Sequence, residues 1–355
     1  MADKTMVKGN EAMAEAAIRA GCRLYFGYPI TPQSEFTEYM AKRLPEVGGS
    51  FLQSESEVSA VNMVYGAACT GRRVLTSTSG PGFSLMQEGM SYIAGAELPS
   101  VFVNVVRGGP GLGDIQPAQS DYFQATKGGG HGDYHAVVLA PGTIQEAVEL
   151  VHDAFDIADK YRTPVIILAD GMLGQMMEPV VFGEFRNLES LSDHLSWSLT
   201  GAKNREPHKV TSFNIDPYEL EKMNMRYQEK YKKIIANEIL YETSNMEDAD
   251  FALVGFGTMG RILGSVIRRA REEGIKVGLF RPVTLWPFPY DALREAVADK
   301  KFVLDVEMST GQMIEDVRLA VGDSLPVHFY GRTGGVVPNP DEVLRVLKER
   351  IEEVK

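Results

Sequence analysis

The sequence lacks the features that would place it in a membrane or on nucleic acid. No apolar stretch approaches the roughly 20 residues that a membrane-spanning helix needs, and residues 1–21 lack the apolar core and cleavage site of a signal peptide. The 355 residues include 36 Lys and Arg against 48 Asp and Glu, a net charge of −12. Because phosphate groups are bound by clustered Lys and Arg, this balance argues against nucleic acid and against an anionic membrane surface. We therefore expect a cytoplasmic protein.

Cysteine is almost absent. The chain has 2 cysteines, Cys22 and Cys69, which lie far apart in the sequence. They make no Cys-x-x-Cys pair and no zinc box, and they are too few to hold an iron–sulfur cluster. We therefore expect no metal site in this chain, and any redox chemistry must use groups other than its sulfur atoms.

What the sequence does contain is two regions in which strands and helices alternate. From residue 7 to about 170, short β-branched runs alternate with helical periodicity, which is typical of a parallel sheet covered on both faces. The alternation returns from residue 249. Between these regions, residues 184–245 are polar and irregular and include a charged helical pattern over 218–242. The fold class expected is α/β, with a first domain over 1–183, a connector over 184–245 and a smaller second domain over 246–355.

Glu57 lies at the start of a helical segment that has almost no polar face. Residues 58–70 carry no formal charge, and a helix that is apolar nearly all round is buried in a core or an interface. A carboxylate at its start would be partly desolvated, with a raised pKa unless it is paired, and such groups perform acid–base chemistry at neutral pH. The structural alternative is a capping box, because Ser54-Glu55-Ser56-Glu57 fits the S-x-x-E pattern and a cap contributes about 0.5–2 kcal/mol.

Three motifs in order resemble the pyrimidine-binding domain of thiamine diphosphate enzymes. They are FGYPIT at 26–31, Glu57 followed nine positions later by Gly66, and the strand, Gly-Pro-Gly loop and helix at 76–105. Glu55 is the neighbouring acid but lacks the spacing to Gly66. The resemblance implies that Glu57 bonds N1′ of the aminopyrimidine and promotes the imino tautomer, which removes the C2 proton of the thiazolium. It also implies cofactor contacts from Tyr28, Pro29, Ser79 and Gly80.

Within that superfamily, YPITP, QSESE and VVRGGPGLG resemble the α-subunit of 2-oxoacid:ferredoxin oxidoreductases over nearly the whole chain. The branched-chain (2-oxoisovalerate) type is the most similar, and the 2-oxoglutarate type is the alternative. The resemblance implies conversion of a 2-oxo acid, CoA and oxidised ferredoxin to acyl-CoA, CO₂ and reduced ferredoxin. It further implies that Thr31 and Arg107 contact the 2-oxo acid.

The position of Arg107 in the sequence independently supports a role in binding a carboxylate. It ends the apolar run VFVNVV, and a guanidinium there would offer a bidentate fork to a planar carboxylate in a dry setting. The alternative for Arg107 is an internal salt bridge.

The motif that would bind the diphosphate is missing. Thiamine enzymes hold this group through Mg²⁺ on a Gly-Asp-Gly motif followed by Asn, whereas Ala169-Asp170-Gly171 has no such Asn after it and Gly322-Asp323-Ser324 fits no better. Two phosphates nevertheless need a metal and a helix N-terminus. We therefore expect a β subunit that carries the diphosphate and Mg²⁺, together with a γ subunit and a ferredoxin-like δ subunit that carry [4Fe–4S] clusters. The chain alone should be inactive.

A glycine motif in the second region favours a different function. Gly255-x-Gly257-x-x-Gly260 lies between a strand and a helix, as in dinucleotide-binding folds, but the acid about 20 residues on is missing. The next strand ends instead in Arg281, which hints at an NADP-dependent oxidoreductase. The same stretch resembles the C-terminal domain of the transketolase type, in which these glycines make a tight turn and bind no nucleotide.

The sequence leaves two further alternatives open. His131 in the long loop over 108–134, and His135 directly after it, could shuttle protons near a site, although loop histidines are more often polar surface. The chain could also be a non-catalytic assembly subunit, in which the apolar helix is an interface and Glu57 is its cap.

Overall fold

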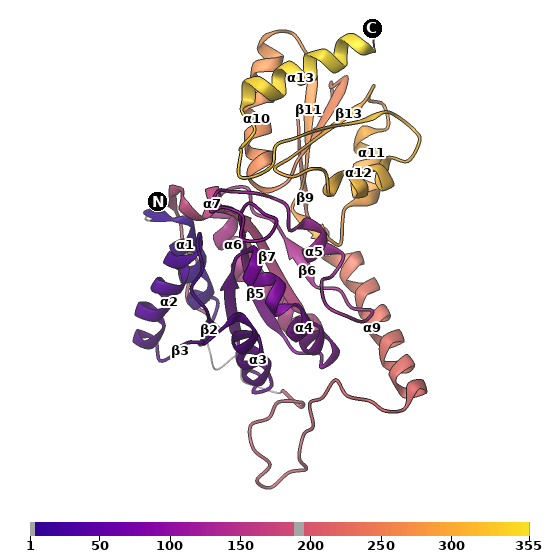
Figure 1. Cartoon of the computed structure of the whole chain (residues 1–355). Helices are drawn as coiled ribbons and strands as arrows, with labels where there is room; N and C mark the ends of the chain where they lie inside the picture. The colour runs from indigo at the N-terminus through magenta and orange to yellow at the C-terminus, as the bar shows by residue number, and fades with distance from the viewer. Residues whose placement is uncertain (1–3, 188–194, 355) are drawn as a thin grey trace.

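The computed structural model describes residues 4–187 and 195–354, which form two α/β units, one above the other (Figure 1). Each unit is built on a largely parallel sheet with helices on both faces. The α/β fold class expected from the sequence is confirmed. In the described ranges, no helix is both long enough and apolar enough to span a membrane.

The first sheet has seven strands in the order β12-β6-β7-β5-β4-β2-β3, and every pair is parallel except β12 with β6. Every residue of its central strands is buried, because helices cover both faces. The strands are β2 (Leu24–Gly27), β3 (Ser50–Gln53), β4 (Val74–Thr78), β5 (Ser100–Val106), β6 (Val137–Leu139), β7 (Pro164–Asp170) and β12 (Thr284–Trp286). One face packs against α1 (Gly9–Arg19), α2 (Ser34–Glu46) and α6 (Ile144–Tyr161), and the other against α3 (Glu57–Ala68) and α4 (Gly80–Gly95).

Helix α3 begins one residue after its cap, Ser56, whose hydroxyl accepts a hydrogen bond of 3.3 Å from the backbone N–H of Ser59. Glu57 is therefore the first helical residue, and the capping box considered as the structural alternative, between Ser54 and Glu57, is wrong. The helix is also less buried than its composition indicates. Val58, Asn62 and Gly66 form an exposed stripe on this chain, with Val58 44% exposed, while Ala60, Val61 and Val64 are in the core.

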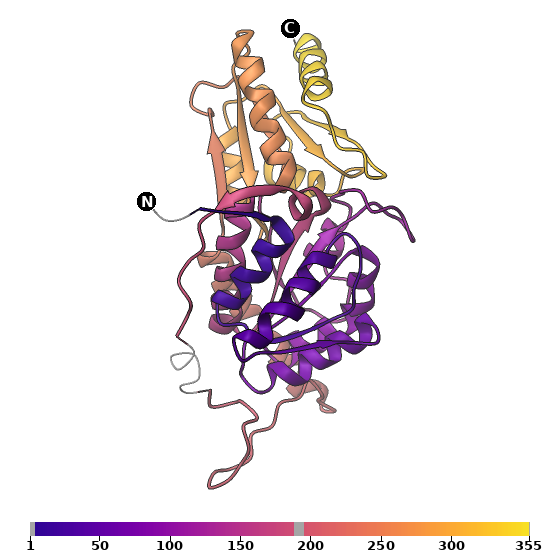
Figure 2. The same cartoon turned by 90° about the vertical axis from the view of Figure 1, so that its left-hand side faces the viewer.

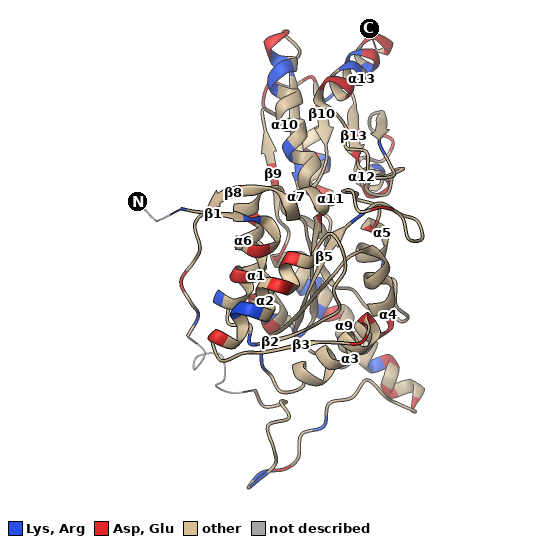
Figure 3. Ribbon diagram, turned by 60° about the vertical axis from the view of Figure 1, so that its left-hand side comes forward, with Lys and Arg blue, Asp and Glu red and all other residues tan. Residues whose placement is uncertain are grey.

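The second sheet has five strands in the order β14-β13-β10-β11-β9, all parallel except β9 with β11. The strands are β9 (Tyr241–Ser244), β10 (Phe251–Val254), β11 (Val277–Pro282), β13 (Val303–Glu307) and β14 (Val327–Gly331). Helices α10 (Gly257–Glu272) and α13 (Pro340–Glu353) pack on one face, and α11 (Tyr290–Val297) and α12 (Met313–Val321) on the other. These outer helices α10 and α13 carry much of the charge visible in Figure 3, whereas α3 and α4 carry little.

The segment between the two regions wraps the first unit, as far as it is described; residues 188–194 of the expected connector lie outside the described residues. Residues 195–216 form an arm that extends away from the second unit (Figure 2). Helix α9 (Pro217–Asn237) then returns along the first unit. The helix predicted over 218–242 ends at Asn237, because residues 241–244 pair with β11 as an edge strand.

Four shorter elements complete the fold. Strands β1 (Thr5–Lys8) and β8 (Met177–Val180) pair with each other, and helices α5 (Tyr122–Thr126) and α7 (Gly171–Gln175) follow β5 and β7. The two units interlock, because β12 comes from the second half of the sequence yet lies at the edge of the first sheet. Helices α11 and α12 share a hydrophobic core with β5, β7 and α4.

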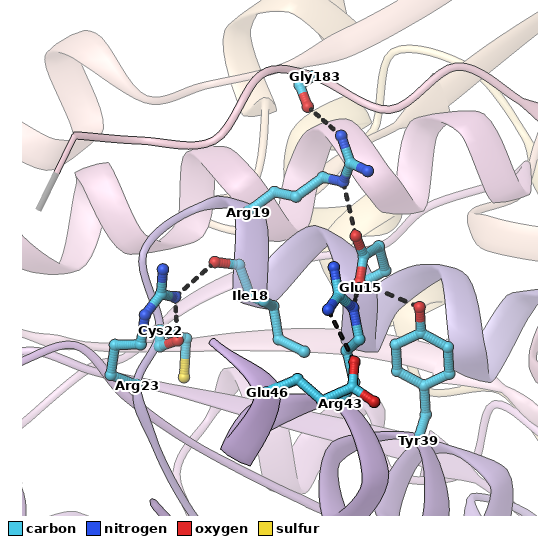
Figure 4. A network of polar contacts seen from close by, with 9 residues as sticks. All are labelled: Glu15, Ile18, Arg19, Cys22, Arg23, Tyr39, Arg43, Glu46 and Gly183. Atoms are coloured by element: carbon cyan, nitrogen blue, oxygen red, sulfur yellow. Dashed lines mark hydrogen bonds and ion pairs between the residues drawn. The ribbon is translucent and has the colours of Figure 1, made fainter. Parts of the chain in front are cut away.

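A polar network ties α1, α2 and the segment after β8 together at the amino ends of the strands (Figure 4). The carboxylate of Glu15 accepts from Arg19 at 2.7 Å and from the hydroxyl of Tyr39 at 3.0 Å, and it lies 3.5 Å from Arg43. Arg19 also donates to the carbonyl of Gly183 at 3.0 Å. Since ligand sites of parallel sheets form at the opposite, carboxyl end, this network has a structural role.

Candidate active site

The candidate residues gather at the carboxyl ends of β2, β4 and β5. The strand order reverses between β2 and β4, since β3 lies on one side of β2 while β4 and β5 continue on the other. A crevice at such a reversal is where open parallel sheets bind ligands. Residues 28–32, 79–82 and 107–117 all leave the sheet at this edge.

The carboxyl group of Glu57 is buried and unpaired. Glu57 is 5% exposed, and its side chain forms no hydrogen bond or ion pair with any other described residue. Burial is the main reason that its pKa is raised, and a hydrogen bond with its own backbone opposes the shift. A carboxyl group whose pKa is raised by burial keeps its proton to a higher pH than an exposed carboxyl group does.

The Gly-Pro-Gly turn at the start of α4 fits closely against this carboxyl group. A Cβ placed on Gly82 would collide with the hydroxyl of Thr78 and the carboxylate of Glu57, so only glycine allows the approach. Ser79 precedes the helix and is fully buried, yet its Oγ has no hydrogen-bond partner among the described residues. The unpaired carboxyl group of Glu57, the unpaired hydroxyl of Ser79 and the close glycine turn at Gly82 suit an aminopyrimidine ring, which needs hydrogen-bonding partners. These residues therefore fit the pyrimidine half of thiamine diphosphate.

Arg107 joins the loops that follow β5 and β2. Its Nη1 donates to the carbonyl of Thr31 at 2.9 Å, its Nη2 donates to the carbonyl of Leu112 at 3.0 Å, and its buried Nε has no partner among the described residues. The residue is 9% exposed and makes no ion pair within the described ranges. The salt bridge considered for Arg107 is therefore wrong, and three N–H groups of the guanidinium stay available to an anion.

The turn at Thr31 is fixed by further donors that the sequence did not reveal. The carbonyl of Pro32 accepts from Nδ2 of Asn10 at 2.8 Å and from Nε2 of Gln175 at 3.0 Å. The side chain of Thr31 itself is exposed, as are Tyr28 and Pro29 in the same loop. The backbone of this turn is thus held by three side chains, while Tyr28, Pro29 and Thr31 are left exposed.

Asp121 and Asn104 are site residues that the sequence analysis missed. Nδ2 of Asn104, on β5, donates to Oδ2 of Asp121 at 2.9 Å, and the carboxyl group of Asp121 faces Gly80. The sequence signal was weak, since Asp121 lies in a long loop and Asn104 in the middle of an apolar strand.

The glycine turn of the second unit offers no room for a nucleotide. Gln119 from the first unit covers it, donating from Nε2 to the carbonyl of Phe256 at 2.9 Å and accepting at Oε1 from the N–H of Met308 at 3.1 Å. The backbone N–H of Gln119 also donates to the carbonyl of Met308 at 2.8 Å. Arg281 is buried and pairs with Glu146 and Glu242. The groups that the NADP alternative required are therefore occupied by the protein itself.

The two loop histidines lie in different surroundings. His131 is exposed, whereas His135 stacks on Trp286 with a centroid distance of 4.4 Å. Burial, and then the charge of Lys127, lower the pKa of His135. It lies at the amino end of β6, away from the candidate site, which indicates packing. In the described part of the chain, no cluster of three or more His, Cys, Asp or Glu could hold a metal ion.

Comparison with known proteins finds family models that match both units of the chain. Residues 15–241 match the family model described as pyruvate flavodoxin/ferredoxin oxidoreductase, thiamine diphosphate-binding, and residues 249–343 match pyruvate:ferredoxin oxidoreductase core domain II. The fold and site thus define a subunit of a thiamine diphosphate-dependent 2-oxoacid:ferredoxin oxidoreductase. The chain belongs to the pyruvate flavodoxin/ferredoxin oxidoreductase family, and the resemblance to its α-subunits is confirmed.

Two related subunits and one solved structure show how similar this chain is to members of the family. The ketoisovalerate oxidoreductase subunit VorB of Methanothermobacter marburgensis is 50% identical over 97% of this chain and 97% of its own length. The 2-oxoglutarate synthase subunit KorA of the same organism is 36% identical over 97% and 98%. The structure of a 2-oxoglutarate:ferredoxin oxidoreductase from Magnetococcus marinus superposes with a TM-score of 0.87 at 28% identity, covering 100% of this chain and 66% of that one. Relatives of this length are named as subunits, which implies partner subunits here.

Proposed function

We propose that this chain supplies the pyrimidine half of the cofactor site and the carboxylate site for the substrate in a branched-chain 2-oxoacid:ferredoxin oxidoreductase. The observation that carries the proposal is the buried, unpaired carboxyl group of Glu57 against Gly82, at the same sheet edge as Arg107. The branched-chain assignment rests on the 50% identity to a ketoisovalerate oxidoreductase subunit, against 36% to a 2-oxoglutarate synthase subunit. 2-Oxoglutarate is the alternative substrate.

Glu57 is the proposed catalytic residue. Thiamine diphosphate, when bound, supplies the electron sink that accepts the electron pair released as a 2-oxo acid loses CO₂. Glu57 would hold a proton at its carboxyl group for exchange with N1′ of the ring, which its raised pKa allows. Ser79 and Gly80 would line the ring from the start of α4, and Tyr28 and Pro29 from the loop after β2.

Arg107 and Thr31 are the proposed substrate residues. The free N–H groups of Arg107, including Nε, would bind the carboxylate of the 2-oxo acid, and the exposed hydroxyl of Thr31 would bond an oxygen of the same substrate. Both are held before the substrate arrives, because the guanidinium donates to the Thr31 carbonyl. Preorganised donors of this kind lose little freedom on binding.

The proposal requires partners. The exposed stripe of Val58, Asn62 and Gly66 lies on the helix that begins at Glu57. Apart from the adjacent backbone of the helix itself, no atom of the described residues lies within 4 Å of a Cβ placed on Gly66. We propose that this stripe faces a β subunit that carries the diphosphate and Mg²⁺. A γ subunit and a ferredoxin-like δ subunit with [4Fe–4S] clusters, CoA as acyl acceptor and ferredoxin as electron acceptor complete the scheme.

Three further expectations from the sequence stay predictions. They are the division into a pyrimidine-binding domain over 1–183, a connector over 184–245 and a transketolase C-terminal-like domain over 246–355, the inactivity of the isolated chain, and the cytoplasmic location.

The test is to purify the complex that this chain forms and to measure CoA-dependent reduction of ferredoxin with several 2-oxo acids. We expect kcat/KM to be at least about tenfold higher for 2-oxoisovalerate than for 2-oxoglutarate or pyruvate, a preference of about 1.4 kcal/mol. If kcat/KM were higher for 2-oxoglutarate, that acid would become the proposed substrate. A complex that oxidises no 2-oxo acid would refute it.

A further inference from the structure

Four buried polar side chains form a closed ring of contacts next to the turn that carries Thr31. Thr37 on α2 and Ser77 on β4 both donate to Oε1 of Gln33, at 3.1 Å and 2.7 Å. The hydroxyl of Tyr25 on β2 lies 2.9 Å from Oγ1 of Thr37 and 2.7 Å from Oγ of Ser77, which closes this polar ring. Its four members are at most 5% exposed. The polar ring therefore joins β2, α2 and β4 to the side chain of Gln33.

Stability alone does not account for a glutamine at position 33. Its Oε1 accepts two hydrogen bonds, but its buried Nε2 has no partner among the described residues. A buried donor without a partner costs free energy, and native proteins contain few of them. Apolar side chains of the same shape would avoid that cost. The amide of Gln33 is therefore expected to have a task besides stability.

The backbone of Gln33 fixes the turn that Thr31 belongs to. Its N–H donates to the carbonyl of Ile30 at 3.1 Å, and its carbonyl accepts from the N–H of Phe36 at 3.0 Å, in the first turn of α2. Thr31 lies between Ile30 and Gln33, and its carbonyl accepts from Nη1 of Arg107 at 2.9 Å. The position of Gln33 thus determines where the guanidinium finds its acceptor.

The polar ring relates this turn to the sheet. Ser77 belongs to β4, which pairs with both β2 and β5, and Arg107 follows directly after β5. Asn10 and Gln175, which hold the carbonyl of Pro32, come from α1 and α7 instead. Through Ser77, the turn is therefore held in register with the strands that lead into the candidate site.

We propose that Gln33 is a positioning residue for the 2-oxo acid. The polar ring holds its side chain, Gln33 holds the turn, and the carbonyl of Thr31 thereby keeps the guanidinium of Arg107 oriented for the carboxylate of the substrate. The inference rests on the proposed role of Arg107. Its physical basis is preorganisation, because a guanidinium that is already oriented loses less freedom when a carboxylate binds.

The experiment alters the polar ring at Thr37, which is not among the residues proposed to contact the substrate or the cofactor. Thr37→Val keeps the shape of the side chain but cannot donate to Gln33, whereas Thr37→Ser keeps the hydroxyl. The assembled complex is titrated by calorimetry with 2-hydroxyisovalerate, which has the carboxylate but no 2-carbonyl group to react. We expect Kd to rise about 3–10-fold in Thr37→Val, as for one lost hydrogen bond, and to stay near the wild-type value in Thr37→Ser. In turnover, KM for the 2-oxo acid should rise with Kd while kcat changes little.

Tyr227→Phe is the control for a purely structural effect. The hydroxyl of Tyr227, which is 4% exposed, donates to the carbonyl of Gly95 at 2.6 Å, at the last residue of α4. This variant also loses one buried hydrogen bond, so thermal unfolding should show a destabilisation like that of Thr37→Val. Its Kd should equal that of the wild type. An unchanged Kd in Thr37→Val, or an equal rise in Thr37→Val and Tyr227→Phe, would overturn the inference.

Two further variants complete the test. If Thr37→Val does not assemble, Ser77→Ala removes the other donor to Oε1 of Gln33 and should raise Kd by a similar factor; an unchanged Kd there would also overturn the inference. Arg107→Lys separates this inference from the proposed function. Unchanged affinity for 2-hydroxyisovalerate in Arg107→Lys would reject the carboxylate site itself, whereas weakened affinity in that variant with unchanged affinity in Thr37→Val would reject only the positioning role of Gln33.

Discussion

The guanidinium of Arg107 donates a hydrogen bond of 2.9 Å to the backbone carbonyl of Thr31. This bond links the loops that follow β5 and β2, two strands that are separated in the sheet by β4. The two residues that the sequence assigned to the 2-oxo acid are therefore held together without any substrate, and a disturbance of one is expected to reach the other.

Replacing Arg107 by Lys tests this arrangement in turnover. Lysine keeps the charge but loses the planar fork, so it cannot reach both the Thr31 and Leu112 carbonyls and still bind a carboxylate. We expect KM for the 2-oxo acid to rise about 10–100-fold, equivalent to about 1.5–3 kcal/mol for a lost hydrogen bond to a charged group. Arg72→Lys, at an exposed position, is the control. An unchanged KM in Arg107→Lys would show that the carboxylate binds elsewhere.

Glu57→Gln tests the proton-holding role. The amide is nearly the same size and should leave the fold and cofactor binding intact, but it cannot exchange a proton with a ring nitrogen. In the assembled complex we expect exchange of the thiamine C2 proton, followed by NMR in D₂O, to slow by about 10²–10⁴-fold. Glu55→Gln provides a matched change two residues away on the exposed side and should exchange at the wild-type rate. Normal exchange in Glu57→Gln would remove Glu57 from the mechanism.

Asp316 is expected to hold the two units together. This residue is 2% exposed and accepts from the hydroxyl of Tyr122 at 2.6 Å, from Lys127 at 2.6 Å and from the hydroxyl of Tyr290. Asp316→Asn should lower the free energy of unfolding by about 2–3 kcal/mol, because a charged acceptor of buried donors is lost. Chemical denaturation measures this change. Glu315→Gln, exposed and adjacent, should stay within about 0.5 kcal/mol of the wild type, and equal values for both variants would contradict the prediction.

Asp305 should make stability depend on pH. It is fully buried on β13, and burial, followed by the charge of Glu307, raises its pKa well above the usual value. The folded state keeps this proton, whereas the unfolded state releases it above about pH 4. Stability contributed by the neutral group is therefore complete at low pH and falls by up to about 1.4 kcal/mol per pH unit as pH rises, until the folded pKa is reached.

Asp305→Asn removes this titration, so its stability relative to the wild type should grow as pH rises from about 5 to about 8. Urea denaturation at several pH values measures the difference, with Asp323→Asn at an exposed position as the control. A constant difference between Asp305→Asn and the wild type across this range would mean that Asp305 is ionised in the folded protein.

The sequence predicted those parts of the fold that depend on local pattern. Alternating strands and helices indicated two parallel sheets, and the order of YPITP, Glu57 and the Gly-Pro-Gly turn located the sheet edge that carries the site. Helix boundaries were less certain, because Ser54 and Ser56 are both good caps and their sequence context does not distinguish them. The structure selects Ser56.

Features that depend on contacts distant in sequence were not predicted. Residues 241–244 continue a charged helical pattern, yet they form β9 because β11 offers an unpaired edge. Asp121 gave no signal, since its hydrogen bond with Asn104 forms only when the loop after β5 folds back over the sheet. Gln119 likewise shows its role only once the second unit is in place.

The edge strand β12 has a consequence for biosynthesis. Its residues, 284–286, pair with β6, which is made almost 150 residues earlier. While the ribosome is still translating the intervening segment, Val138 and Leu139 present an open strand edge, and open edges recruit other chains. The nascent N-terminal half should therefore need a chaperone or rapid completion of translation to escape aggregation, and cutting the gene between the two units is a poor way to obtain a well-behaved fragment.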